Sequence, residues 1–155
     1  RQLMDSVLKF GQARLCPPTL EQVGAAACFR NMKHFVGQMI AEYQSRRDVV
    51  YQELLTLEGA VYRKPEGAFY VVAKLPVDSS EKFARWMLKD FDVDGRTTMV
   101  APAGGFYATA GRGADEVRIA YVLNEENLKD AMKILLKGVE EYGRTHATRE
   151  AETTG

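Results

Sequence analysis

The sequence lacks the features that mark several large classes of protein. Lysine plus arginine and aspartate plus glutamate each number 21 among the 155 residues, so the formal net charge is zero. Without an excess of positive charge, counterion release does not drive binding to nucleic acid, and we expect no nucleic-acid partner. No apolar run approaches the roughly 20 residues that cross a bilayer, so we expect no membrane span. Residues 1–4 do not resemble the start of a signal peptide either.

Cysteine and histidine are scarce. The two cysteines, Cys16 and Cys28, are too few for a disulfide framework and lack a metal-type partner pair. The two histidines, His34 and His146, argue against a histidine-based catalytic triad and against a metal cluster. We therefore expect no metal site and a reducing, cytoplasmic setting.

Common catalytic and nucleotide-binding motifs are also missing. None of the four serines stands in a Gly-x-Ser-x-Gly context. The glycines between residues 104 and 113 do not form a dinucleotide-binding or P-loop fingerprint at the start of a helix. We interpret them as the glycines of a structural loop.

A long helical pattern is the first positive feature. No proline occurs between Pro18 and Pro65, and apolar residues step by three or four along this stretch. The pattern predicts a helix from Lys33 to Leu57, with one arginine, Arg47, inside the apolar stripe. A length on the order of 37 Å suits a helix that bridges two domains. A helix of a bundle would show the same periodicity.

Strand and helix patterns follow. Aromatic and β-branched residues predict strands at 68–73, 97–100 and 116–123, with a Gly-rich loop at 102–113. A capping box from Asp78 to Glu81 and a cap at Asn124 each predict a helix. The last helix directs apolar residues toward the core, namely Leu128, Met132, Leu135 and Val139.

The order of these elements predicts the fold class. Helix, strand, helix, strand, strand and helix give an α/β (α+β) fold, a two-layer sandwich of a small mixed sheet with helices on one face. From Gly143 onward the sequence is polar and without periodicity, which predicts a disordered tail.

Arg118 is the candidate functional residue. It lies in the middle of the apolar run from Val117 to Val122, opposite the predicted core face of the strand. A buried guanidinium without a partner is costly, so the side chain must reach a carboxylate or an open cavity. Its planar fork matches a carboxylate in bidentate geometry. The pattern is equally consistent with an edge-strand arginine that points to water. The predicted core-facing positions of the strand are Val117, Ile119, Tyr121 and Leu123.

Three motifs occur in a fixed order in the second half of the chain. Residues 64–70 read Lys-Pro-Glu-Gly-Ala-Phe-Tyr, residues 100–107 Val-Ala-Pro-Ala-Gly-Gly-Phe-Tyr, and residues 116–123 Glu-Val-Arg-Ile-Ala-Tyr-Val-Leu. Together they resemble the small-domain signatures of the class I/II aminotransferases, fold type I enzymes that depend on pyridoxal phosphate. The resemblance covers roughly Gln12 to Tyr142 and is nearest to bacterial aspartate aminotransferases.

The resemblance implies a carboxy-terminal segment of a longer gene product, and the chain begins at Arg1 rather than at a methionine. Residues 1–32 would be the tail end of the large cofactor domain. Residues 33–142 would be the small domain with its long interdomain helix, and residues 143–155 the polar tail. The resemblance also implies a homodimer, pyridoxal 5′-phosphate in the full-length protein, and amino-acid and 2-oxo-acid substrates.

The resemblance assigns roles to three residues. Arg118 matches the arginine that binds the substrate α-carboxylate, in agreement with the strand pattern. Phe69 would lie near the substrate pocket, although a core aromatic would fit the sequence equally well. Residues 12–18 resemble a stretch that reaches the active site of the partner subunit, where Arg14 would bind a second substrate carboxylate.

The family residues that hold the cofactor have no counterpart in this sequence. None of its nine lysines stands in the context of the Schiff-base lysine. We therefore expect no catalytic or cofactor-binding residue in this chain and no activity of the chain alone, while its parent is a transaminase. One alternative is the same small domain in a pyridoxal-phosphate-dependent decarboxylase, lyase or synthase. Others are a non-catalytic aminotransferase-like effector domain of a regulator and a free-standing fragment that self-associates.

Overall fold

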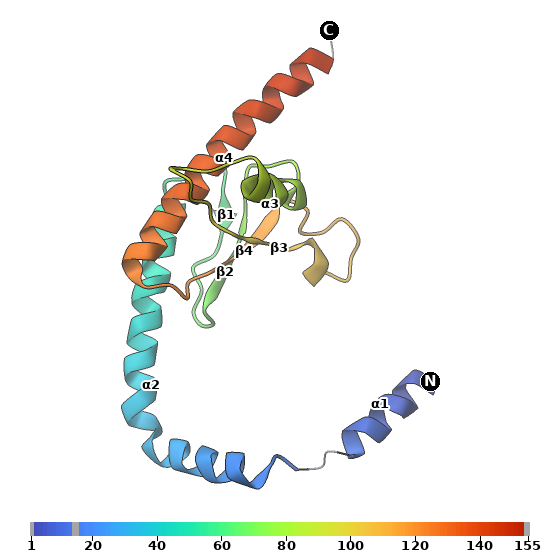
Figure 1. Cartoon of the computed structure of the whole chain (residues 1–155), viewed down its shortest axis with the longest axis vertical. Helices are drawn as coiled ribbons and strands as arrows, with labels where there is room; N and C mark the ends of the chain where they lie inside the picture. The colour runs from blue at the N-terminus through green and yellow to red at the C-terminus, as the bar shows by residue number, and fades with distance from the viewer. Residues whose placement is uncertain (1, 14–15, 154–155) are drawn as a thin grey trace. The chain divides into compact units, whose positions relative to one another are not determined.

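The computed structural model describes residues 2–13 and 16–153, with the side chains of those up to Thr145. The chain divides into two compact units, Arg1–Ile40 and Ala41–Gly155 (Figure 1). In the described ranges, no helix combines the length and the apolar character that a membrane span requires.

The first unit is helical. Helix α1 (Gln2–Gln12) has no buried residue, and its apolar side chains, among them Leu3, Val7 and Phe10, are exposed. Helix α2 (Thr19–Leu54) starts directly after the proline pair, well before the predicted start at Lys33, and the division between the units falls within it. The earlier start has a local reason, because residues 25–27 are alanines, the strongest helix formers.

The second unit is built on a four-stranded sheet. Strands β1 (Val61–Tyr62), β2 (Tyr70–Lys74), β3 (Ala101–Pro102) and β4 (Glu116–Ala120) lie in the order β1-β2-β4-β3. Every pairing is antiparallel, so the expectation of a mixed sheet is wrong in this respect. The chain returns directly from β1 to β2 and from β3 to β4, and such direct returns give antiparallel neighbours.

The strand boundaries differ from the predicted ones in three places. β2 begins at Tyr70 rather than at residue 68, because Ala68 takes a left-handed conformation with φ of 63°. The predicted strand at 97–100 is replaced by β3 at 101–102, and the Thr97 hydroxyl instead donates to the Met87 carbonyl at 2.8 Å. β4 ends at Ala120, and Leu123, predicted to face the core, is exposed. The short strand β1 was not predicted.

One face of the sheet is covered by helices, which confirms the predicted two-layer α/β class. The helices α3 (Ser80–Lys89) and α4 (Glu125–Thr153) pack with the end of α2 against this face. The core residues include Val50 and Leu54 of α2, Val71 and Ala73 of β2, Phe83 and Met87 of α3, Val117 and Ile119 of β4, and Leu128, Met132, Leu135 and Val139 of α4.

The helix caps explain where α3 and α4 begin. Asn124 caps α4 as predicted, since its side-chain oxygen accepts a hydrogen bond from the Asn127 amide at 2.9 Å. The cap of α3 is Ser79 rather than Asp78, because the Ser79 hydroxyl accepts from the Lys82 amide. The Asp78 carboxylate is otherwise engaged, accepting from the Lys82 ammonium and from the Tyr142 hydroxyl, both at 2.8 Å.

α4 continues to Thr153, past Gly143, where the sequence predicts a disordered tail. In this part of α4, two contacts each join residues that are four positions, about one helical turn, apart. Arg144 pairs with Glu140, and the Thr145 hydroxyl donates to the Glu141 carbonyl at 2.9 Å. An ion pair between side chains four residues apart, such as Glu140 and Arg144, stabilises a helix locally even where its sequence lacks an apolar stripe.

Candidate functional site

Arg118 lies on a central strand of the sheet. In the register of β4, it stands opposite Val72 of β2 on one side and Ala101 of β3 on the other. An edge-strand arginine, the alternative that the sequence left open, is therefore wrong. Its strand neighbours Val117 and Ile119 point into the core, so alternation directs Arg118 to the opposite face of the sheet. We call this the open face.

Two aromatic rings hold the guanidinium of Arg118. Its central carbon lies 5.3 Å from the ring centroid of Tyr70 and 4.8 Å from that of Phe106. Tyr70 begins β2, and Phe106 ends the short 3-10 helix η1 (Gly104–Phe106). Both distances are in the range of cation–π attraction, and aromatic faces suit a planar guanidinium. The rings therefore restrict the orientation of the cation without using its N–H groups.

The guanidinium of Arg118 has no hydrogen-bond or ion-pair partner among the side chains described, which end at Thr145. The other charged groups on nearby strand ends are paired. Lys74 lies 2.6 Å from the Asp115 carboxylate, and Glu116 accepts a hydrogen bond from the Tyr107 hydroxyl. That carboxylate raises the pKa of Tyr107. The five N–H donors of Arg118 thus remain available for an anion.

Phe69 contacts the ring of Tyr70, which in turn contacts the Arg118 guanidinium. Its ring is 5.8 Å from that of Tyr70, edge to face, and 6.3 Å from that of Tyr43. With 52% of its surface exposed, Phe69 is not a core aromatic. The rings that contact Arg118 directly are those of Tyr70 and Phe106, which the sequence did not single out. Strand alternation signals Tyr70, because it shares a face with Val72, whereas the sequence marks Phe106 only as part of the 100–107 motif.

The third predicted residue, Arg14, lies outside the described residues. The structure thus brings Phe69 and Arg118 into one region of the second unit.

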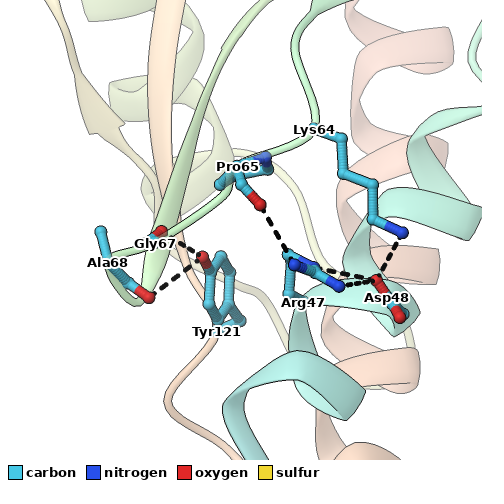
Figure 2. Close-up of polar contacts among 7 residues, drawn as sticks. All are labelled: Arg47, Asp48, Lys64, Pro65, Gly67, Ala68 and Tyr121. Carbon is cyan, nitrogen blue, oxygen red and sulfur yellow. Dashed lines mark hydrogen bonds and ion pairs between the residues drawn. The ribbon is translucent and has the colours of Figure 1, made fainter. Parts of the chain in front are cut away.

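The loop before Phe69 is fixed by contacts with α2 (Figure 2). The Arg47 guanidinium donates to the Pro65 carbonyl at 3.2 Å and to the Asp48 carboxylate at 2.9 Å. The Lys64 ammonium lies 2.8 Å from the same carboxylate. Hydrogen bonds from Arg47, and then from Lys64, lower the pKa of Asp48. Arg47 was visible in the sequence as a charge inside an apolar stripe, but its partners were not.

The end of the same loop is fixed by Tyr121. The hydroxyl of this buried side chain lies 3.3 Å from the carbonyl oxygens of both Gly67 and Ala68, and donates to them (Figure 2). Burial raises the pKa of Tyr121, so the group remains a protonated donor. The predicted core position of Tyr121 is confirmed, and its hydroxyl adds a polar contact that the alternation pattern did not reveal.

The described residues do not fit the cofactor that the resemblance implies. Covalent attachment of pyridoxal phosphate requires a lysine that is desolvated and therefore low in pKa. All nine lysines of the chain are exposed, and the pKa of Lys74 is raised by its hydrogen bond with Asp115. Among the described residues, no group of three or more histidine, cysteine, aspartate or glutamate side chains is arranged to hold a metal ion.

The chain matches the family model of aminotransferase class I and II over residues 3–135. It is 34% identical to the aspartate aminotransferase of Pyrococcus horikoshii over 68% of its own length and 25% of that protein. It is also similar to the crystal structure of an aromatic aminotransferase from Pyrococcus horikoshii, at 32% identity and a TM-score of 0.67. That match covers 86% of this chain and 35% of the other. The chain thus spans roughly a quarter to a third of the length of these relatives.

A further solved structure is similar in fold alone. The α-aminoadipate aminotransferase of Thermus thermophilus, in complex with N-(5′-phosphopyridoxyl)-L-leucine, shares 20% identity and a TM-score of 0.74. The similarity covers 93% of this chain and 36% of that protein.

Proposed function

Because the chain belongs to the aminotransferases of classes I and II, we propose that it is the carboxy-terminal part of a pyridoxal-phosphate-dependent transaminase. In this proposal Arg118 binds the substrate α-carboxylate. The observation that carries it is the environment of the guanidinium, which is partly buried, stacked on two rings and unpaired within the described side chains. An arginine in this condition is prepared to bind an anion.

The chemistry of the substrates matches this single cation. An amino acid and a 2-oxo acid both carry a carboxylate on the carbon next to the reacting group, so one arginine serves both. Tyr70 and Phe106 restrict the guanidinium plane, and its edge presents paired N–H donors to the two carboxylate oxygens. The apolar rings reduce the local dielectric, which strengthens such charge-assisted hydrogen bonds.

Aspartate is the donor we propose. The support is the name of the Pyrococcus horikoshii relative, an aspartate aminotransferase at 34% identity. Arg14 is our candidate for the second carboxylate of such a substrate. Phe69 would line the pocket through its contact with Tyr70.

We propose the domain organisation that the resemblance implies. Residues 1–32 belong to the large cofactor domain, residues 33–142 form the small domain, and residues 143–155 are its tail. The division into two compact units within α2 supports a boundary on this helix. The parent would be a cytoplasmic homodimer. The two exposed, unpaired cysteines, Cys16 and Cys28, suit a compartment that keeps thiols reduced.

The test of Arg118 uses the full-length protein. We expect Arg118→Ala to lower kcat/KM for all amino-acid donors about 100-fold, because a charge-assisted hydrogen bond contributes about 1.5–3 kcal/mol. Arg112→Ala is the matched control. Arg112 also stacks on an aromatic ring, that of Tyr107, but it lies on an exposed loop and should leave kcat/KM unchanged. Wild-type kinetics in Arg118→Ala would contradict the proposal.

The chain alone should neither bind pyridoxal phosphate covalently nor transaminate, because its lysines are exposed. Incubation with the cofactor, borohydride reduction and mass spectrometry would check this. Scattered, substoichiometric labelling is expected, and stoichiometric labelling of one lysine with transaminase activity would contradict it.

The alternatives within the same family are separated by products. A full-length transaminase forms glutamate from aspartate and 2-oxoglutarate, whereas alanine or pyruvate would indicate a decarboxylase or lyase. An effector domain of a regulator would form neither product.

A further inference from the structure

The loop at residues 64–68 holds a conformation that requires support. Ala68 has φ of 63°, a left-handed backbone that residues with a Cβ adopt rarely. The carbonyls of Pro65, Gly67 and Ala68 all accept hydrogen bonds from side chains of other elements rather than from a neighbouring strand. The position of this loop is therefore set by the donors, Arg47 at its start and Tyr121 at its end.

Arg47 is itself held in place. Two of its nitrogens lie 2.9 Å from the Asp48 carboxylate while the third donates to Pro65. Its side chain is only 18% exposed, and the Asp48 carboxylate that pairs with it is shared with Lys64. Because its charge is already neutralised, Arg47 does not compete with Arg118 for an anion. Its remaining effect is mechanical, on the loop.

The 64–68 loop is followed directly by Phe69 and by Tyr70, whose ring contacts Arg118. The carbonyl of Phe69 accepts from the Tyr121 amide at 2.9 Å, and Tyr70 then pairs with Ala120. Figure 2 shows the Arg47 and Tyr121 contacts on this one short stretch of chain. The ring of Tyr70 lies next in line, 5.3 Å from the Arg118 guanidinium.

Arg118 depends on that ring for its position. Within the described side chains, its guanidinium has only the rings of Tyr70 and Phe106 as partners. A hydrogen-bonded arginine would be fixed by its acceptors, whereas this one follows the rings. A shift of the loop that rotates or retracts Tyr70 therefore displaces the carboxylate-binding fork.

We propose that Arg47 is a positioning residue for Arg118. It fixes the 64–68 loop against α2, and through Tyr70 it sets the orientation in which Arg118 meets a substrate carboxylate. Tyr121, directly after β4, holds the other end of the loop. The inference rests on the proposed function of Arg118 and extends it to a residue on a different element.

The experiment is a double-mutant cycle in the full-length holoenzyme with aspartate as the donor. Arg47→Gln should raise KM about tenfold, equivalent to about 1.4 kcal/mol of binding free energy, with a much smaller change in kcat. In an Arg118→Ala background, the same substitution should leave KM unchanged, because the group through which it acts is gone.

Arg46→Gln is the matched control. Arg46 precedes Arg47 on α2, is 20% exposed, pairs with Glu42 and donates to a backbone carbonyl at 2.7 Å. That carbonyl belongs to Val122, beyond β4, and not to the loop. Both substitutions remove one arginine-to-carbonyl bond, so they should lower the thermal midpoint similarly. Only Arg47→Gln should raise KM.

Tyr121→Phe is a second, milder variant that keeps the buried ring and removes the hydroxyl. It should raise KM in the same way and also lose its effect in the Arg118→Ala background. The proposal is overturned if Arg46→Gln raises KM as much as Arg47→Gln. It is equally overturned if the effects of Arg47 and Arg118 simply add, or if neither loop variant changes KM. Unchanged kinetics in Arg118→Ala would instead overturn the proposed function.

Discussion

The two faces of the sheet differ in what they offer, although they are made by alternate residues of the same strands. On the covered face, Val117 and Ile119 of β4 meet the helices and are buried. On the open face, the guanidinium of Arg118 between them contacts the rings of Tyr70 and Phe106. Consecutive residues thus serve the core and a candidate binding site.

In this small sheet, the residues that stabilise the fold and the residue that is available to bind a ligand lie on opposite faces. Apolar burial stabilises the fold roughly in proportion to the area removed from water. A cation held by rings alone adds little stability but keeps its donors free for a ligand. The comparison predicts that substitutions on the covered face change the free energy of unfolding, whereas those on the open face change binding.

The largest expected effect is on the covered face. Ile119→Ala removes a side chain that is 5% exposed and leaves a cavity, so the free energy of unfolding should fall by about 2–5 kcal/mol. The adjacent Arg118→Ala should change it by less than about 1 kcal/mol. Urea unfolding of this chain, followed by the fluorescence of its single tryptophan, Trp86, measures both changes in the free energy of unfolding. Equal losses in the two variants would break the distinction between the faces.

The covered face could be predicted from the sequence, and the open face only in part. Alternation in β4 and the stripe of α4 place residues such as Val117 and Leu128 by local periodicity, and both are buried. Arg118 was found as a charge in an apolar strand. Its contact with Phe106 was not, because that ring comes from a 3-10 turn in another segment. The bond from Arg47 to the 64–68 loop was not found either, because α2 is distant from the loop in the sequence. Contacts between distant segments leave no periodic trace in the sequence.

A second, intermediate effect concerns the loop that carries Phe106 to the open face. Gly113 has φ of +73°, and a Cβ there would lie 2.5 Å from the Tyr107 ring. Gly113→Ala should therefore destabilise by about 1–3 kcal/mol through strain and displacement of that ring. Gly111→Ala is the matched control, with φ of +80° and no atom within 4 Å of the new Cβ.

The difference between these two glycine variants in urea unfolding isolates the Tyr107 contact from backbone strain. If both lose the same free energy, the packing of Tyr107 does not contribute. Backbone strain at a residue with positive φ would then account for the whole loss in both variants.

The smallest expected effect compares two carboxylates, Asp48 beside the 64–68 loop and Asp78 beside the core. The pKa of Asp48 lies below the usual 3.8 mainly because Arg47 donates a hydrogen bond to it. The pKa of Asp78 is lowered mainly by the hydrogen bond from Lys82. A lowered folded-state pKa adds stability that is present above pH 3.8 and is lost as pH falls through the folded value. Both groups are almost half exposed, so screening limits each contribution to about 0.5–1 kcal/mol.

In urea unfolding, the free energies of Asp48→Asn and Asp78→Asn should therefore lie below that of wild type at pH 6. They should approach it as the pH falls below 3.8 and through the lowered folded-state pKa values. Their stability profiles should resemble each other, because each loses one carboxylate of similar exposure.

The kinetics of the two variants in the full-length protein should differ. Asp48 orients Arg47, which bonds the loop that carries Tyr70, so Asp48→Asn should raise KM for the donor. Asp78 bonds Lys82 and Tyr142 on the core side, and Asp78→Asn should leave KM unchanged. A rise in KM for both variants would mean that acid-sensitive stability, rather than loop position, controls the open face.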